Sequence, residues 1–266
     1  MTTKAMDTPA PVSPWRSHGL LFLLAMMYAD NFVGRQIIAV MIEPIKHEFG
    51  ASDTSMGLIS GLAFAAVFAV LGLPAGRLAD RLPRIALLSV SCIFWGIATI
   101  LCGLTGSFLL LVLARMAVAA TEAPSAPAAL SLIADLYPPQ RRAFAISLFT
   151  AAPTFAAIIA LSLGAWLVEG YGWRTSFMLV GVPALLVGTL LAIFGREPAR
   201  GFWDTPVAHT APSDMQATVK GLWAVKPVRY LIAASATATL GGTAFGMWNA
   251  TFLVRSHHLA LQHAGL

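Results

Sequence analysis

The chain has 266 residues, of which 58% are hydrophobic and only 11% are charged, and its mean hydropathy is +0.75. Soluble domains carry roughly 25% charged residues, so a water-soluble globule would have too few polar side chains to cover these apolar faces. The net charge of +5 is also typical of nucleic-acid-binding proteins, but no basic face with interleaved aromatic residues accompanies it, and we expect no nucleic-acid partner. The composition predicts an all-α membrane protein.

Seven apolar runs follow a polar, Pro-rich tail (1–17), and each is long enough to cross a bilayer, which takes about 20 residues. The first run is too long for the apolar region of a secretory signal, so we interpret it as a membrane helix. The runs cover residues 18–41, 56–76, 85–106, 108–132, 143–168, 175–195 and 228–254.

Four ionisable residues lie inside these runs: Asp30 and Arg35 in the first, and Arg115 and Glu122 in the fourth. A charge at the centre of a bilayer is costly unless it faces a hydrated cavity or a partner charge. Arg115 and Glu122 are seven residues apart, so they lie on one stripe of their helix, about 10 Å apart along its axis. Two interpretations stay open. The four residues line a cavity where an acid exchanges a proton and an arginine holds an anion, or they form a static ion pair between the first and fourth helices.

Charged segments connect several of the runs. Residues 76–84 are too rich in charge to lie in hydrocarbon, so we predict a short turn there that contains Gly76, Asp80, Arg81 and Arg84. A second charged group follows the fourth run, and we predict that it contacts the first, either as a gate or as a static dock. This second group comprises Asp135, Arg141 and Arg142.

The distribution of Lys and Arg predicts a cytoplasmic N-terminus, because these residues accumulate in cytoplasmic loops. With this orientation only Lys46, Arg174 and Arg255 lie on the outer side. The inner segments hold Lys4, Arg16, Arg77, Arg81, Arg84, Arg141, Arg142, Arg196, Arg200, Lys220, Lys226 and Arg229. The first outer turn then contains three acids, Glu43, Glu48 and Asp53, which we expect to be solvated.

No enzyme motif accompanies these features. The sequence lacks the metalloprotease pattern H-E-x-x-H, a phosphate-binding P-loop and the nucleophile motif G-x-S-x-G, which are common signatures of catalytic sites. Cys92 and Cys102 are about 15 Å apart along one helix, too far for a disulfide. We expect neither an enzyme activity nor a cofactor or metal.

Residues 76–84 resemble the signature loop G-x-L-A-D-R-x-G-R-R between the second and third helices of the major facilitator superfamily. The matching residues are Gly76, Leu78, Ala79, Asp80, Arg81 and Arg84. Shorter segments, spread over nearly the whole chain, are similar to the spinster-like branch of that superfamily through their order and spacing. They are residues 43–46, 52–54, 57–61, 113–115, 122–123, 135–142, 172–174, 196–201 and 255–257.

The resemblance implies roles for the charges inside the membrane. Glu122 and Arg115 match the fourth-helix acid and arginine associated with coupling and substrate binding, and Arg35 matches the arginine of a first-helix Asp-Arg pair. The position of that aspartate is occupied by Gly34, and Asp30 lies one turn earlier on the same face, since four residues return to about the same azimuth.

The resemblance further implies a secondary active transporter that works by alternating access and is coupled to protons. It implies an amphiphilic or lipid-like organic solute and a bacterial-type inner or plasma membrane, and Arg35 and Arg115 would suit an anionic head group on that solute. The family has twelve helices in two halves, so we expect residues 18–195 to form the first six-helix bundle. A cytoplasmic linker (196–227) and the first helix of an incomplete second bundle (228–266) follow, which predicts a fragment or a truncated gene product. A facilitator of small organic anions and a non-transporting membrane remnant are the alternatives.

Overall fold

The computed structural model describes residues 13–204 and 215–257, and all the regular elements in these ranges are helices. Parts of the predicted tail, linker and terminal segment (1–12, 205–214 and 258–266) lie outside the described residues. The prediction of an all-α fold is confirmed.

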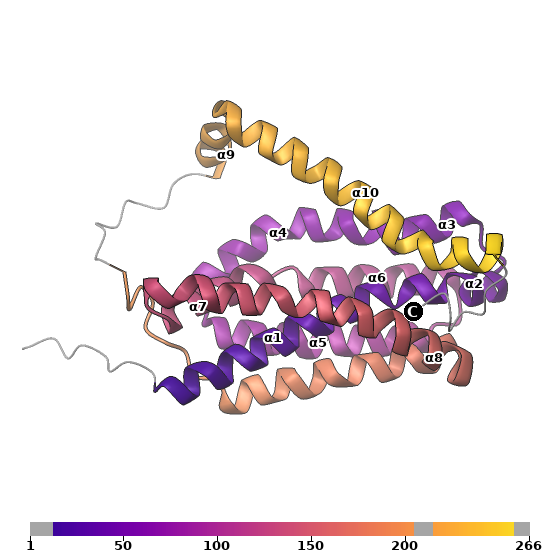
Figure 1. Cartoon of the computed structure of the whole chain (residues 1–266), viewed down its shortest axis with the longest axis horizontal. Helices are drawn as coiled ribbons and strands as arrows, with labels where there is room; N and C mark the ends of the chain where they lie inside the picture. Colours follow the sequence, from indigo (N-terminus) through magenta and orange to yellow (C-terminus); the bar gives the residue numbers. More distant parts are fainter. Residues whose placement is uncertain (1–12, 205–214, 258–266) are drawn as a thin grey trace, which may run out of the picture.

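The long helices run side by side, except that α10 diverges from α4 towards its α9 end (Figure 1). The half of α10 that begins at Lys226 is exposed, whereas Met247, Ala250 and Thr251 near its other end are buried. In chain order the elements are α1 (Pro14–Gln36), α2 (Ile38–Phe49), α3 (Asp53–Gly57), the π-helical turn η1 (Leu58–Leu62), α4 (Ala63–Arg81), α5 (Arg84–Leu104), α6 (Phe108–Glu122), α7 (Ser125–Leu136), α8 (Pro139–Phe194), α9 (Met215–Ala224) and α10 (Lys226–His257).

Four helical segments of the described chain are long and apolar enough to cross a membrane: Asp53–Arg81, Arg84–Leu104, Phe108–Leu136 and Pro139–Phe194. The last has 56 residues and contains the predicted run 143–168 and all but the final residue of the run 175–195. Its backbone turns at Gly172, where φ is 76°, a value that favours glycine because a side chain would clash there. The chain doubles back at this turn (Figure 1), so that α8 provides two antiparallel helices.

The first helix is longer than the sequence predicted. After a break at Ile37 it continues as α2, which ends at Gly50 in the left-handed conformation (φ 60°) that commonly terminates helices. Glu43 and Glu48 therefore lie on a helix, so the expectation of a turn was wrong for them, although both side chains are solvent-exposed as expected. The reason is the apolar stripe of α2, which stays buried beyond residue 41 and holds the helix against its neighbours.

The charged segment 76–84 is also more helical than predicted. Helix α4 continues through Arg81, and only Leu82 and Pro83 connect it to α5. Leu82 is extended (φ −94°, ψ 158°), as expected for a residue before proline, where the α conformation is disfavoured.

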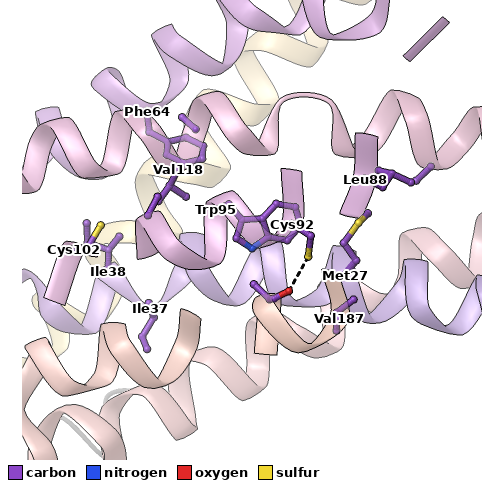
Figure 2. Packing of buried hydrophobic residues seen from close by; sticks show 14 of the residues in the cluster. Met27, Ile37, Ile38, Phe64, Leu88, Cys92, Trp95, Cys102, Val118 and Val187 are labelled. Atoms are coloured by element: carbon purple, nitrogen blue, oxygen red, sulfur yellow. Dashed lines mark hydrogen bonds between the residues drawn. The ribbon is translucent and has the colours of Figure 1, made fainter. Parts of the chain in front are cut away.

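The packed side of the bundle consists of α1, α5 and α8. Glycines allow α5 and α8 to approach closely, since a Cβ on Gly181 would lie 2.7 Å from the carbonyl oxygen of Gly96. Figure 2 shows Trp95 and Cys92 of α5 in this core, where the Cys92 thiol donates to the carbonyl of Ala184 at 3.2 Å. This packing fixes Trp95 beside α1, next to the charged residues described below.

Candidate functional site

A cavity of about 540 Å³ lies between α1, η1, α4, α6 and α10. Aromatic rings and small residues form most of its wall, and two arginines, Arg35 and Arg115, provide its charges. The lining residues are Phe32, Arg35, Gln36, Ser60, Gly61, Phe64, Ala65, Phe68, Arg115, Thr239, Gly242, Thr243, Gly246 and Met247. A concave, mostly apolar site with a few convergent polar groups is the usual form of a small-molecule site.

One wall of the cavity contains an ion pair between α1 and α6. Arg35 Nε donates to Glu122 Oε2 at 2.9 Å, and the side chain of Glu122 is only 1% exposed, compared with 26% for Arg35. Glu122 therefore lies behind Arg35, which borders the cavity. The sequence left open whether these residues line a cavity or form an ion pair, and the structure contains both. The functional roles of these residues remain predictions.

Arg115 borders the same cavity but has a different environment. Its Nη1 donates to the backbone carbonyl of Gly34 at 3.1 Å, its side chain is 1% exposed, and its Nε has no hydrogen-bond partner among the described residues. The guanidinium carbons of Arg35 and Arg115 each lie 5.1 Å from the centre of the Phe64 ring, a distance at which a cation is attracted to an aromatic face. Phe68 contacts Arg35 in the same way, at 4.6 Å.

Asp30 is half-buried and forms no salt bridge with Arg35 or Arg115. Its Oδ2 accepts a hydrogen bond from Trp95 Nε1 of α5 at 3.3 Å. Five residues along a helix turn the side chain by about 140°, so Asp30 and Arg35 lie on different faces of α1. The adjacent Asn31 is 1% exposed, and its amide lies beside the carboxylate of Glu122.

Sequence reasoning missed the aromatic and amide residues of this site. Phe64 and Phe68 are four residues apart and thus share a helix face, which is the only signal they carry in the sequence. Trp95 and Asn31 carry none, because their neighbours are set by the packing of other helices against theirs. Among the described residues, no group of three or more His, Cys, Asp and Glu side chains could hold a metal ion.

The α4–α5 connection contains a second polar cluster, centred on Arg84, whose side chain is only 1% exposed. Arg84 donates to Asp135 through Nη1, to Glu197 at 2.6 Å through Nε, and to Ser131 and the carbonyl of Pro198. Asp135 also accepts from the backbone N–H of Gly201 at 2.9 Å. The predicted contact between the two charged groups is therefore present through Arg84 and Asp135.

The other residues of the two groups behave differently. Asp80, Arg81 and Arg141 are exposed, and their side chains make no polar contact within the part of the chain that the structure describes. Arg142 donates to the carbonyl of Ala134 at 2.8 Å and to Asp204 at 3.0 Å. Gly76 is half-buried, with open space beside it. The sequence did not single out Glu197, whose carboxylate completes the Arg84 cluster from beyond α8.

A third polar cluster, which we name the Arg255 cluster, joins α10 to α2 and α3 at the opposite end of the bundle. Arg255 donates to Glu43 at 2.7 Å and to both carboxylate oxygens of Asp53, at 2.9 and 3.0 Å, and Lys46 donates to Asp53 at 2.6 Å. Hydrogen bonds to Asp53 and Glu43 raise the pKa of Arg255 above its usual range, so the guanidinium stays charged. Glu43 and Asp53 are solvent-exposed, as expected. The sequence did not predict that both are also bound by Arg255, which directly follows the seventh predicted run.

Glu48 has a partner of its own. Its carboxylate accepts from Arg174 Nη2 at 2.6 Å and from Trp173 Nε1 at 2.7 Å, and the hydrogen bonds from Arg174 hold the pKa of Glu48 below its usual value. This contact ties α2 to the second half of α8.

The family assignment rests on nearly the whole chain, since the family model of the Major Facilitator Superfamily matches residues 22–266. The chain belongs to the Major Facilitator Superfamily. It is thus an integral, multi-pass membrane protein of a family of transporters rather than enzymes.

Similar proteins place this Major Facilitator Superfamily chain in the spinster-like branch. A solved bacterial homologue of the human lysosomal transporter Spinster, in an inward-facing and unoccupied conformation, superimposes with a TM-score of 0.85 at 31% identity over 96% of this chain and 59% of that one. An MFS-type efflux pump of Mycolicibacterium smegmatis is 31% identical over 99% of this chain and 60% of its own length. The sphingosine-1-phosphate transporter SPNS2 of Danio rerio is 30% identical over 85% of this chain and 45% of its own length. The chain spans about 60% of the length of the first two of these proteins.

Proposed function

We propose that this chain acts in a secondary active transporter that moves an anionic, amphiphilic organic solute together with protons by alternating access. The observation that carries the proposal is the Arg35–Glu122 ion pair, whose arginine lines the cavity. In this proposal the Arg84 end of the bundle faces the cytoplasm, because most Lys and Arg of the loops lie on that side.

In this proposal the ion pair couples proton binding to solute binding. While Glu122 is ionised, its carboxylate is the counter-ion of Arg35 at 2.9 Å. When Glu122 takes up a proton, Arg35 loses that counter-ion and is free to bind an anion in the cavity. Since coupling between two binding events is reciprocal, a bound anion then favours the protonated form of Glu122, and proton and anion travel in the same direction.

The walls of the cavity support an amphiphilic solute. Phe32, Phe64 and Phe68 offer apolar surface for a hydrocarbon part, and Arg35 and Arg115 offer charge for an acidic head group. The relative from Danio rerio is named as a transporter of sphingosine-1-phosphate, and a phosphate is a group that arginine binds well.

The Arg255 cluster supports a gating role at the other end of the bundle. It holds α10 against α2 and α3, while the α9 end of α10 stands apart from α4 (Figure 1). With the Arg84 end in the cytoplasm, this arrangement corresponds to a cavity closed on the outside. Alternating access then requires the contacts of Arg255 with Glu43 and Asp53 to break when the outside opens.

A second candidate function is a facilitator of small organic anions that is not driven by protons. Gly34 favours it, because this position lacks the carboxylate that the spinster-like pattern places beside Arg35. The two candidates differ in one property: a coupled transporter accumulates solute against its gradient, whereas a facilitator only equilibrates it.

Transport in proteoliposomes tests the proposal. The product of the complete open reading frame is reconstituted, and the uptake of radiolabelled decyl phosphate is followed with and without an imposed pH gradient. We expect accumulation that requires the gradient and collapses when a protonophore is added. Uptake that only equilibrates would favour the facilitator, and uptake equal to that of protein-free liposomes would contradict a transport function.

A further inference from the structure

Asn31 places a buried amide beside the carboxylate of Glu122. Asn31 comes from α1 and Glu122 from the end of α6, and each of them is only 1% exposed. The amide of Asn31 hydrogen-bonds no other group among the described residues. Buried polar side chains are normally paired, so the carboxylate of Glu122 is the partner that this amide serves.

Helix α1 presents two side chains to Glu122. Asn31 lies four residues before Arg35, so the two share one face of the helix, and Arg35 Nε donates to Glu122 Oε2 at 2.9 Å. Arg35 lines the cavity, whereas Asn31 and Glu122 are not among its lining residues. A substitution at Asn31 therefore reaches a solute in the cavity only through Glu122.

These two partners of Glu122 differ in their hydrogen-bonding chemistry. A guanidinium group only donates, whereas an amide both donates and accepts. Arg35 can therefore bind only the ionised carboxylate. Asn31 can donate to the ionised carboxylate through Nδ2, and it can accept the O–H of the protonated group through Oδ1. In the proposed cycle Arg35 leaves Glu122 to bind the solute, so Asn31 is the partner that stays.

Three further ionisable groups lie near Glu122, and each of them hydrogen-bonds a group other than its carboxylate. They are Arg115 on α6, Asp30 on α1 and Cys92 on α5. Their influence on Glu122 is the influence of their charge at a distance. An uncharged substitution at Asn31 leaves that influence in place, so it isolates the contribution of the amide.

We propose that Asn31 is a positioning residue for the carboxylate that exchanges the proton. Its amide keeps the side chain of Glu122 in one place while Arg35 alternates between Glu122 and the solute, and it sets the pH range over which Glu122 takes up its proton. A hydrogen bond to an ionised group is about twice as strong as one to a neutral group, so the amide favours the ionised form. This inference rests on the proposed function, in which Glu122 is the group that exchanges the proton.

Replacing Asn31 by leucine tests the inference, because leucine has a similar size and no amide. Asn249→Leu is the matched control, since it makes the same change at a half-buried position of α10 that does not line the cavity. The C=O stretching band of protonated carboxyl groups is titrated by infrared difference spectroscopy. The sample is the reconstituted product of the complete open reading frame, without solute and without a pH gradient. The signal of Glu122 is the component of this band that is lost in Glu122→Gln.

We expect Asn31→Leu to raise the midpoint of the Glu122 titration by about one pH unit. A tenfold gain in proton affinity of this kind corresponds to the loss of one hydrogen bond to the ionised form. The Glu122 component should also move to a higher wavenumber, because the protonated group loses its hydrogen-bond partner. Asn249→Leu should change neither property. A midpoint that falls or stays the same in Asn31→Leu, or equal shifts in both variants, would overturn the inference.

A second variant and the choice of conditions keep this test decisive. If Asn31→Leu does not fold, Asn31→Ala takes its place with the same expectations, because it removes the amide without adding a group. The titration needs neither solute nor gradient, so a failure to transport decyl phosphate leaves its outcome unaffected. A protein that accumulates solute but shows the same Glu122 titration with and without the Asn31 amide would retain the proposed function and lose this assignment. If Glu122→Gln removes no component of the band, the proposed coupling and this inference fail together.

Discussion

Glu122→Gln is expected to abolish the accumulation of solute by a pH gradient while leaving the cavity intact. A gradient of about two pH units sustains about 100-fold accumulation when one proton accompanies each solute anion, since each unit corresponds to a factor of ten. In the variant the ratio of solute inside to solute outside should be about 1. Glutamine neither gains nor loses a proton, so proton binding no longer controls whether Arg35 is free to bind the solute. The measurement is the steady-state ratio of labelled decyl phosphate in proteoliposomes.

Two controls give this result its meaning. Glu48→Gln makes the same chemical change in the contact with Arg174, outside the cavity, and should accumulate solute like the wild type. Exchange of labelled for unlabelled solute without a gradient should persist in Glu122→Gln, which would show that the carrier still moves. Full accumulation by Glu122→Gln together with its loss in Asp30→Asn would contradict the assignment and place the coupling carboxylate on α1.

Replacing Arg84 by methionine is expected to lower the free energy of unfolding more than any other substitution considered for this protein. The guanidinium is buried and binds Asp135, Glu197, Ser131 and the carbonyl of Pro198. Methionine preserves the apolar stem but leaves the buried carboxylate of Asp135 without its cation, and breaking a buried pair in this way costs about 3–5 kcal/mol. Unfolding in mixed detergent micelles, followed by tryptophan fluorescence, measures the difference in free energy.

Arg81→Met is the matched control for Arg84→Met. Arg81 is three residues earlier and exposed, so its loss should change the free energy of unfolding by no more than about 0.5 kcal/mol. Arg84→Lys should lie between the two, because an ammonium group keeps the charge but cannot reach several acceptors as a planar fork does. An effect of Arg84→Met no greater than that of Arg81→Met would refute the account of the Arg84 cluster.

The fold could be predicted because lipid imposes a simple rule. Runs of about 20 apolar residues must be helical when no water is available to the backbone, and the charged segment 76–84 identifies the superfamily by its order of residues. Helix ends were predicted less well. Glu43 and Glu48 looked like loop residues, but the buried apolar stripe of α2 continues the helix beneath them.

Pairings between distant residues could be predicted only in part. Arg35 with Glu122 and Arg84 with Asp135 were within reach, because few charges lie at each level of the bundle. The partner of Arg255 was not, since Glu43 and Asp53 are more than 200 residues earlier in the chain, and only the placement of α10 brings them together. The orientation of Asp30 towards Trp95 likewise depends on how α5 packs against α1.

The central claim is that Glu122, in its ion pair with Arg35, is the group that exchanges the proton. Infrared difference spectroscopy on the reconstituted protein tests it directly, by following the C=O stretching band of a protonated carboxyl group as the pH is lowered from neutral to mildly acidic. We predict that a component of this band is retained in Asp30→Asn and lost in Glu122→Gln. A band of unchanged intensity in Glu122→Gln would contradict the account.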